Sequence, residues 1–147
     1  MRSLGVLAAL LTFLSFLSGC AKELGRVPFS APGAGETTMT LAAGEVGVWT
    51  DLDIEWEGPA ALAYQVDLFQ NGTCVVSTVC NPLGKHRVRM GWVSSDVGES
   101  HSWRGNGKMG CEVSLAQAGP TTVKVNLAWG TTPAKHTLRK ADLVLKQ

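Results

Sequence analysis

The sequence predicts an all-β fold, an antiparallel β-sandwich of the jelly-roll or immunoglobulin-like kind with about seven to nine strands. Two observations lead to this prediction. Apolar residues alternate with polar residues in short runs throughout residues 36–147, and Gly, Pro and Asn separate these runs. No stretch in this range shows a sustained helical period. Short alternating runs divided by turn residues are typical of two packed antiparallel sheets.

Alternation locates the strands along the chain. The first clear run covers residues 51–56, and later runs cover 87–92, 111–115 and 123–129. Residues 143–145 form a last strand. Because side chains on a strand point alternately to opposite faces, the apolar members of each run are expected in the core. Most of the tryptophans other than Trp103 occupy apolar positions of such runs and are expected in the core, namely Trp49, Trp56, Trp92 and Trp129.

A hairpin is predicted where residues 64–70 precede the Asn-Gly pair at 71–72. Asn-Gly tolerates the positive φ angles of a type I′ turn, so residues 73–80 are expected to return alongside. If the ladder is regular from the turn onward, Val75 and Val79 share the core face of the hairpin.

Residues 1–20 predict export. A lone Arg2 precedes an apolar run that ends at Leu17. This run is shorter than the ~20 residues that a membrane span needs, as in a signal peptide. The segment closes with Leu-Ser-Gly-Cys, ending at Cys20, and this motif resembles the lipobox of bacterial lipoproteins. The resemblance implies a diacylglycerol on the Cys20 thiol, cleavage before it, and acylation of the new amino end.

The same resemblance implies an address and a domain organisation. In Gram-negative lipoproteins an Asp after the Cys retains the protein in the inner membrane, whereas Ala21 stands here. The implied location is therefore the cell envelope, on the outer membrane, held through the lipid on Cys20. Two or three acyl chains anchor stably without any further membrane-binding surface. The expected segments are a signal peptide over 1–19, a lipidated end and spacer over 20–35, and a sandwich domain over 36–147.

The body of the domain carries a second resemblance. The segments LAAGEVGVW, YQVDLFQNG and LAQAGPTTVKVNLAW resemble the strand rhythm of jelly-roll domains of the pre-peptidase C-terminal type. That likeness implies a fold and says nothing about a ligand.

Once Cys20 is lipidated, three cysteines remain, and in an oxidising compartment they can form a disulfide. Cys74 and Cys80 lie on one predicted strand, ~20 Å apart, which exceeds the ~7 Å limit for a disulfide. Cys80 ends its strand and Cys111 begins another, so a Cys80–Cys111 bridge is predicted. Cys74 is then expected to be a small, half-buried filler.

Charge is distributed unevenly along the chain. Residues 27–84 contain seven acids and no Lys or Arg, whereas residues 85–147 contain ten Lys or Arg and four acids. A nucleic-acid-binding protein would be basic as a whole, so the charge disfavours that class. We expect the halves to supply neighbouring strands with opposed charges, the alternative being a dipolar docking surface. The expected opposing rows are Asp51, Asp53 and Glu55 against Arg87 and Arg89.

The sequence offers little sign of catalysis. There is no G-x-S-x-G motif, no Gly-rich phosphate loop and no closely spaced Cys or His pair for zinc. His86, His101 and His136 stand in unrelated settings and are interpreted as surface imidazoles. The prediction is a protein that is not an enzyme and uses no metal or cofactor, with a hydrolase as the least favoured alternative.

One segment invites a functional interpretation. Residues 94–107 are predicted to form a fourteen-residue loop that carries His101, Trp103 and Arg104. Trp and Arg are enriched at binding hot spots, so we expect this loop to bind another envelope protein. A glycan-binding module that stacks a sugar on Trp103 is the alternative, and it should expose two coplanar aromatics. Trp103 could also plug the end of the sandwich.

The lipobox gives a direct prediction. Cys20→Ser removes the thiol that receives the lipid, so the full-length precursor should accumulate without lipidation or cleavage. Intact-mass spectrometry of the wild-type protein and the variant measures this. An unmodified Cys20, or a wild-type chain that starts elsewhere, contradicts the prediction.

Overall fold

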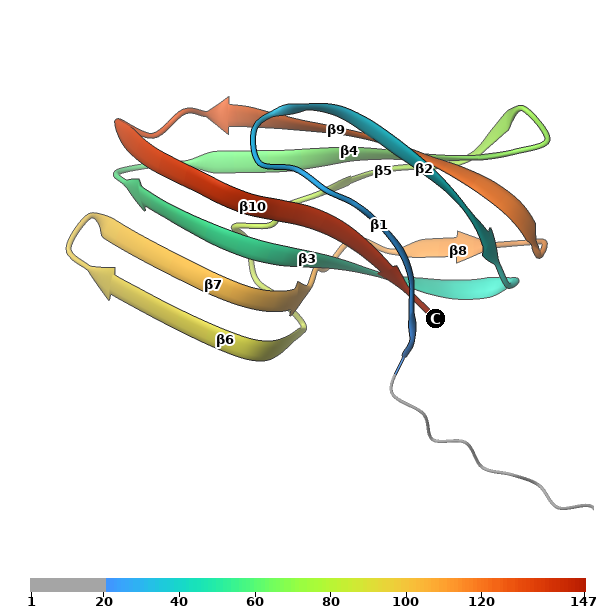
Figure 1. Cartoon of the computed structure of the whole chain (residues 1–147), viewed down its shortest axis with the longest axis horizontal. Helices are drawn as coiled ribbons and strands as arrows, with labels where there is room; N and C mark the ends of the chain where they lie inside the picture. The colour runs from blue at the N-terminus through green and yellow to red at the C-terminus, as the bar shows by residue number, and fades with distance from the viewer. Residues whose placement is uncertain (1–20) are drawn as a thin grey trace, which may run out of the picture.

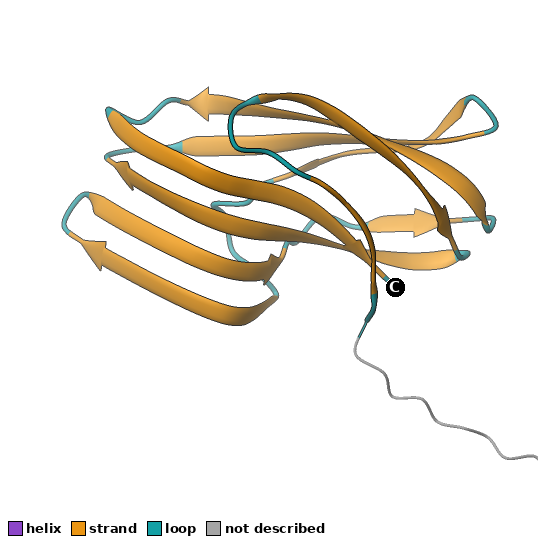
Figure 2. Cartoon of the chain, viewed as in Figure 1, coloured by secondary structure: helices purple, strands orange, loops and turns teal. Residues whose placement is uncertain are grey.

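The structure is a computed structural model that describes residues 21–147, and it is an all-β sandwich of ten strands, which confirms the predicted fold class (Figure 1). Figure 2 shows that short loops connect the strands. No helix within the described part of the chain could span a membrane. Cys20 and the predicted signal peptide lie outside the described residues.

Two antiparallel sheets form the sandwich. The larger has the order β1-β10-β3-β7-β6, with β8 paired to β3, and the smaller has the order β2-β9-β4-β5. Part of the predicted spacer over 20–35 forms β1 and the start of β2. The strands are β1 (Glu23–Val27), β2 (Gly33–Leu41), β3 (Gly44–Glu57), β4 (Ala61–Gln70), β5 (Thr73–Cys80), β6 (Val88–Val97), β7 (Ser100–Lys108), β8 (Val113–Leu115), β9 (Gly119–Thr131) and β10 (Lys135–Lys146).

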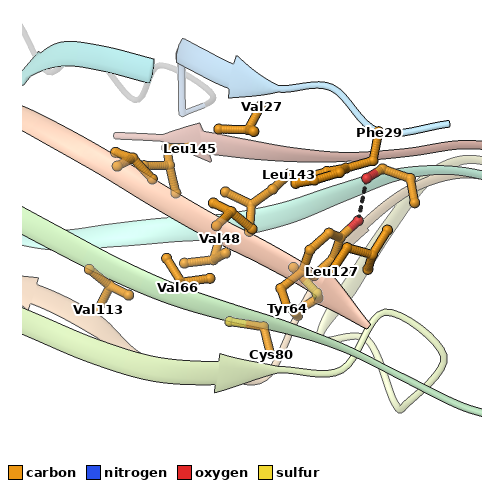
Figure 3. Close-up of a cluster of buried hydrophobic side chains, with 14 of the residues drawn as sticks. Val27, Phe29, Val48, Tyr64, Val66, Cys80, Val113, Leu127, Leu143 and Leu145 are labelled. Carbon is orange, nitrogen blue, oxygen red and sulfur yellow. Dashed lines mark hydrogen bonds between the residues drawn. The ribbon is translucent and has the colours of Figure 1, made fainter. Parts of the chain in front are cut away.

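The core lies between the facing surfaces of the two sheets, and Tyr64 crosses it. Tyr64 is fully buried among aliphatic side chains such as Leu127 and Leu143 (Figure 3). Its hydroxyl lies 2.8 Å from Thr50 Oγ1 and donates to the carbonyl of Ala141 at 2.8 Å. Burial raises the pKa of this phenol well above its ordinary value. A polar contact thus joins β4 of the smaller sheet to β3 and β10 of the larger sheet.

The predicted Asn-Gly hairpin is confirmed. Asn71 and Gly72 have φ angles of 51° and 75° and connect β4 to β5. Next to the turn, Phe69 pairs with Cys74, as a two-residue turn requires.

Beyond that pair the predicted register is wrong, because a bulge intervenes. The ladder shifts after Leu68, which pairs with Val76. Since side chains alternate along a strand, one extra residue exchanges the two faces of β5. Val75 and Val79, expected in the core, are 44% and 59% exposed, and Cys80 is buried in their place.

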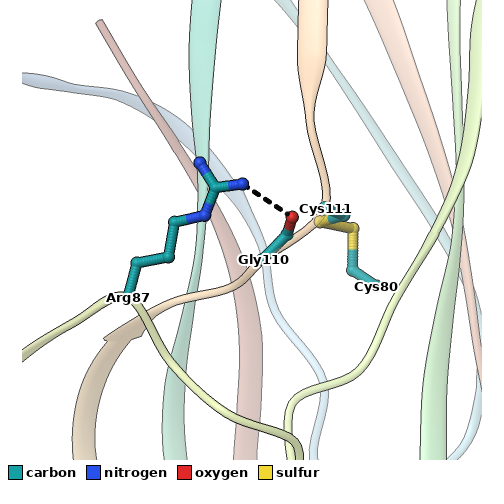
Figure 4. The surroundings of a disulfide bond; sticks show 4 residues. All are labelled: Cys80, Arg87, Gly110 and Cys111. Atoms are coloured by element: carbon teal, nitrogen blue, oxygen red, sulfur yellow. Dashed lines mark hydrogen bonds between the residues drawn. A yellow bond between two sulfur atoms is a disulfide. The ribbon is translucent and has the colours of Figure 1, made fainter.

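The disulfide between Cys80 and Cys111 is confirmed, with the two Cα atoms 5.3 Å apart (Figure 4). It joins the end of β5 to the segment between β7 and β8. Cys74 is a free and exposed thiol, so its predicted half-buried position is wrong. The bulge turns Cys80 inward, whereas Cys74 lies between the turn and the bulge, where it pairs with Phe69 as predicted.

The acidic row of β3 is neutralised by cations of β10 and of β1 beyond it, and not by the expected partners. Asp51 binds Arg26 at 3.1 Å, and Arg139 lies 3.3 Å from both Asp53 and Glu55. These cations belong to β1 and β10. The predicted pairing with Arg87 and Arg89 is wrong, because β7 separates β6 from β3. Arg87 instead binds Glu112 at 3.0 Å.

The Tyr64 contact gives a stability prediction. Tyr64→Phe should lower the free energy of unfolding by ~1–3 kcal/mol, because the buried carbonyl of Ala141 loses its donor. Urea denaturation measures the change. In a Tyr64→Phe background, Thr50→Val should then cost less than it does alone, because the Thr50 hydroxyl has already lost its partner. Additive effects of the two substitutions contradict this account.

Candidate functional site

The segment predicted as a loop is a hairpin. Ser94–Val97 belong to β6 and Ser100–Gly107 to β7, and the turn between them uses Gly98 at a φ of 58°. The prediction is wrong because β7 carries no aliphatic alternation. One of its faces carries two aromatic residues followed by two glycines, and the other is polar, so the sequence resembles a polar loop.

The candidate residues His101, Trp103 and Arg104 lie on opposite faces of this hairpin. In the ladder with β3, His101 pairs with Trp56 and Trp103 with Ile54, both of which are buried core residues. His101 and Trp103 therefore lie on the inner face, which turns toward the smaller sheet. Arg104 is exposed on the outer face. The structure thus brings together two of the three.

The inner face holds a cluster of rings. Trp103 lies edge-on to Trp56, with ring centroids 5.1 Å apart, and edge-on to Trp92 at 5.5 Å. His101 stacks on Trp56 at 4.8 Å, and His86 approaches Trp92 at 4.9 Å. We call these five residues the aromatic cluster. Edge-to-face and offset contacts of this kind stabilise packing beyond simple burial.

His86 is buried rather than a surface imidazole, which corrects the prediction. Its ring lies on Gly107, where a Cβ atom would approach the ring within 2.8 Å. Nδ1 accepts a hydrogen bond from Arg89 Nε at 3.2 Å, so Nε2 donates to the Pro82 carbonyl at 2.7 Å. Burial lowers the pKa of His86, and the charge of Arg89 acts in the same direction.

The polar groups of the inner face bind one another. Asp96 Oδ1 is 2.6 Å from His101 Nδ1 and accepts a hydrogen bond from Trp103 Nε1 at 3.0 Å. The hydrogen bond with His101 lowers the pKa of the Asp96 carboxyl. The Arg89 guanidinium lies 4.5 Å from the Trp92 ring centroid and 5.4 Å from that of Trp103. These contacts leave few inner-face groups free for a ligand.

The Asp96–His101 pair has the geometry of an acid that orients a base. Among residues 21–147, however, the pair with Asp96 is the one side-chain hydrogen bond that His101 makes. A hydrolase triad needs a hydroxyl or thiol beside the second imidazole nitrogen. Within the same range, no three His, Cys, Asp or Glu side chains lie close enough to hold a metal ion.

The outer face of β6 is apolar and exposed. Val88, Met90, Val93 and Val97 are 47%, 50%, 62% and 72% exposed, and we call these four residues the outer apolar row. β6 ends its sheet, so one side of the strand has no neighbour in the described residues. A bulge between Met90 and Val93 turns Trp92 inward and keeps both flanking segments apolar on the outside. The alternation in the sequence located this strand, but its apolar residues were expected in the core, and that expectation is wrong for Val88 and Met90.

A shallow groove of about 330 Å³ lies beside this row, near the hairpin turn. Its lining includes Glu55, Glu57, Ser95, Ser102 and Lys135. Lys135 lies 3.7 Å from Glu57, and Glu55 binds Arg139, so cations partly neutralise both carboxylates. The groove gives the apolar row a polar margin.

Comparisons with known proteins add no functional residue. No protein-family model matches the chain, and no curated protein matches it in sequence. The lipobox and the jelly-roll likeness therefore remain predictions.

Burial of His86 gives a pH prediction. The unfolded chain protonates this imidazole near the ordinary pKa of 6.5, whereas the folded protein does so only at lower pH. The free energy of unfolding should therefore fall as the pH drops through that value. His86→Gln should reduce this dependence in urea denaturation between about pH 7.5 and about pH 5.5. His136→Gln, at an exposed site, is the control. Equal pH dependence in wild type and His86→Gln contradicts the prediction.

Proposed function

We propose that this chain is a lipid-anchored protein of the bacterial cell envelope, without catalytic activity, whose β-sandwich binds another envelope protein. The binding surface is the outer face of the β6–β7 hairpin. The observation that carries the proposal is the outer apolar row, four large apolar side chains that are each about half exposed or more. Contiguous exposed apolar surface with a polar rim is typical of protein–protein binding sites.

The rim of the row supports a protein partner. Arg104 and Lys108 stand on β7 at positions that pair with Val93 and Val88. Arg104 is exposed and has no ion-pair partner among residues 21–147, whereas Lys108 lies 3.7 Å from Glu45. An apolar centre with cationic neighbours favours a partner surface that combines apolar and acidic side chains. Of the predicted residues, Arg104 is the one that lies on this surface.

The position of the hairpin agrees with an anchor at Cys20. Lys22 and Gln147 exchange two backbone hydrogen bonds, so the two ends of the described chain lie together. The β6–β7 turn lies at the left of Figure 1, away from the C-terminus. A lipid on Cys20 would therefore hold the termini near the membrane and direct the turn away from it.

The glycan alternative finds less support. Stacking on sugar rings needs aromatic faces that are open and coplanar. Trp103 instead makes interplanar angles of 79° with Trp56 and 64° with Trp92. All three rings lie on the inner face, and the Trp103 Nε1 group already donates to Asp96. The aromatic cluster therefore packs the inner face of the hairpin against the sandwich and offers no open face for a sugar ring.

Site-specific photocrosslinking tests the proposal. A photoreactive amino acid replaces Val93 in the full-length chain, expressed in the bacterium from which the sequence comes. The expected product joins this chain to a different envelope protein. Val93→Asp should weaken that complex by ~1–3 kcal/mol, because the substitution places a charge in a desolvated contact.

Val79 is the matched control position. It is 59% exposed on β5, at the edge of the other sheet, whereas Val93 is 62% exposed. The same partner crosslinked equally from both positions contradicts the proposal. A product that contains only copies of this chain also contradicts it.

A further inference from the structure

The unpaired side of β6 has the features of a self-complementary edge. We infer that β6 pairs antiparallel with β6 of a second copy about a two-fold axis, which joins the two larger sheets into one. This inference goes beyond the proposed function, because it concerns the backbone edge of β6 rather than its outer face. Half of the backbone N–H and C=O groups of an edge strand point away from its neighbour, and a second strand can satisfy them.

The bulge in β6 selects the register. Val88 and Met90 point outward before the bulge, and Val93, Ser95 and Val97 point outward after it. Directly opposite residues of an antiparallel pair must share a face. Pairing Val88 with Val97 of the second copy meets this requirement and places Met90 opposite Ser95. The two bulges then meet at the centre, and a regular three-residue ladder lies on each side.

Charge supports the same register. Arg89 lies near one end of β6 and Asp96 near the other, both on the inner face. When Val88 opposes Val97, Arg89 of each copy opposes Asp96 of the other. Asp96 is half exposed and its Oδ2 has no hydrogen-bond partner among residues 21–147, and the same holds for both Nη groups of Arg89. Opposed unlike charges stabilise a cross-strand pair, whereas parallel pairing would oppose like charges.

The edge strand β5 of the smaller sheet shows that an exposed apolar edge strand is not by itself enough to predict pairing. β5 also ends its sheet and exposes Val75 and Val79. It contains no charged residue between Thr73 and Cys80, so it has no polarity that would favour antiparallel pairing in one register. β5 therefore serves as a matched negative control.

Pairing would enlarge the surface described above. Side-by-side β6 strands place the outer apolar rows of two copies on one continuous sheet face. A single pair of strands buries little area, so the dimer should be weak when the protein is dilute. Confinement of both copies to one membrane raises their effective concentration and favours the pairing.

Disulfide crosslinking between two tagged full-length copies tests the inference. Both copies carry Cys74→Ser, which removes the exposed free thiol. One copy carries Val88→Cys and the other carries Val97→Cys. Oxidation of membranes that contain both should yield a covalent heterodimer, because opposite Cα atoms lie ~4.5–5.5 Å apart, within the ~7 Å limit for a disulfide.

The proposed register also predicts which pairs of cysteine variants should not crosslink. Two copies that both carry Val88→Cys should not crosslink, because in the dimer the two substituted positions lie nine residues apart along the strand, or ~30 Å. Two copies that both carry Val97→Cys should not crosslink for the same reason. Val88→Cys combined with Val79→Cys should not crosslink either, because Val79 lies on β5, which takes no part in the pairing. Equal crosslinking in all combinations, or none in the Val88→Cys and Val97→Cys pair, overturns the inference.

A charge exchange separates specific pairing from chance collision. Arg89→Glu added to the Val88→Cys copy should abolish the crosslink, because it faces Asp96 of the second copy. Asp96→Lys added to the Val97→Cys copy should restore it. Failure of restoration overturns the charge argument, provided that each variant retains a wild-type melting transition. These outcomes are independent of whether Val93 contacts another envelope protein, so the proposed function can fail while the dimer stands.

Discussion

The Cys80–Cys111 disulfide is the constraint on which the placement of the β6–β7 hairpin depends. The bond joins two residues that are 31 positions apart, and the enclosed segment contains the whole hairpin. In the chain-entropy account, closing a loop of this length stabilises the fold by ~3–4 kcal/mol. Among residues 21–147, β6 has no strand neighbour except β7, and β7 pairs with the rest of the sandwich through β3 alone. The disulfide fixes the loop before β6 and the segment after β7 at one point, where Arg87 also donates to the Gly110 carbonyl (Figure 4).

This constraint explains why the two faces of the hairpin differ. The loop before β6 brings His86 onto Gly107, and the aromatic cluster fills the rest of the inner face. Asp96 and Arg89 bind within the same cluster, so the inner face satisfies most of its own polar groups. The outer face receives no cover in the described residues. The apolar row on this face is therefore available to a partner, and the edge of β6 is available to a second strand.

Sequence patterns predicted the sandwich, most of its strands, the Asn-Gly turn and the disulfide, because each depends on local periodicity or on covalent geometry. They failed at two of the register shifts in the sheets. One extra residue in the β4–β5 ladder exposed Val75 and Val79, and the irregularity in β6 turned Trp92 inward. No composition signal marks either bulge. The hairpin itself was missed because Gly105 and Gly107 occupy inner positions where aliphatic side chains would have shown alternation.

The site was predicted in part for a related reason. Trp103 and Arg104 drew attention by type, but adjacent residues of a strand point to opposite faces, so they could not form one surface. Sequence reasoning also assigned the acidic row of β3 to the wrong strand. Its true partners, Arg26 and Arg139, come from the two ends of the chain. In this sheet, strands that are neighbours in space are far apart in the sequence. Their order depends on tertiary packing, which local sequence patterns do not predict.

Native-state hydrogen exchange tests the central claim, that the disulfide holds the hairpin on the sandwich. The comparison is between the oxidised protein and a variant that carries Cys80→Ala together with Cys111→Ala. The account predicts that amides of β6 and β7 lose protection selectively, while those of β4 and β9 keep theirs, because local opening does not require global unfolding. Uniform loss across both sheets, or unchanged protection in the hairpin, would contradict it.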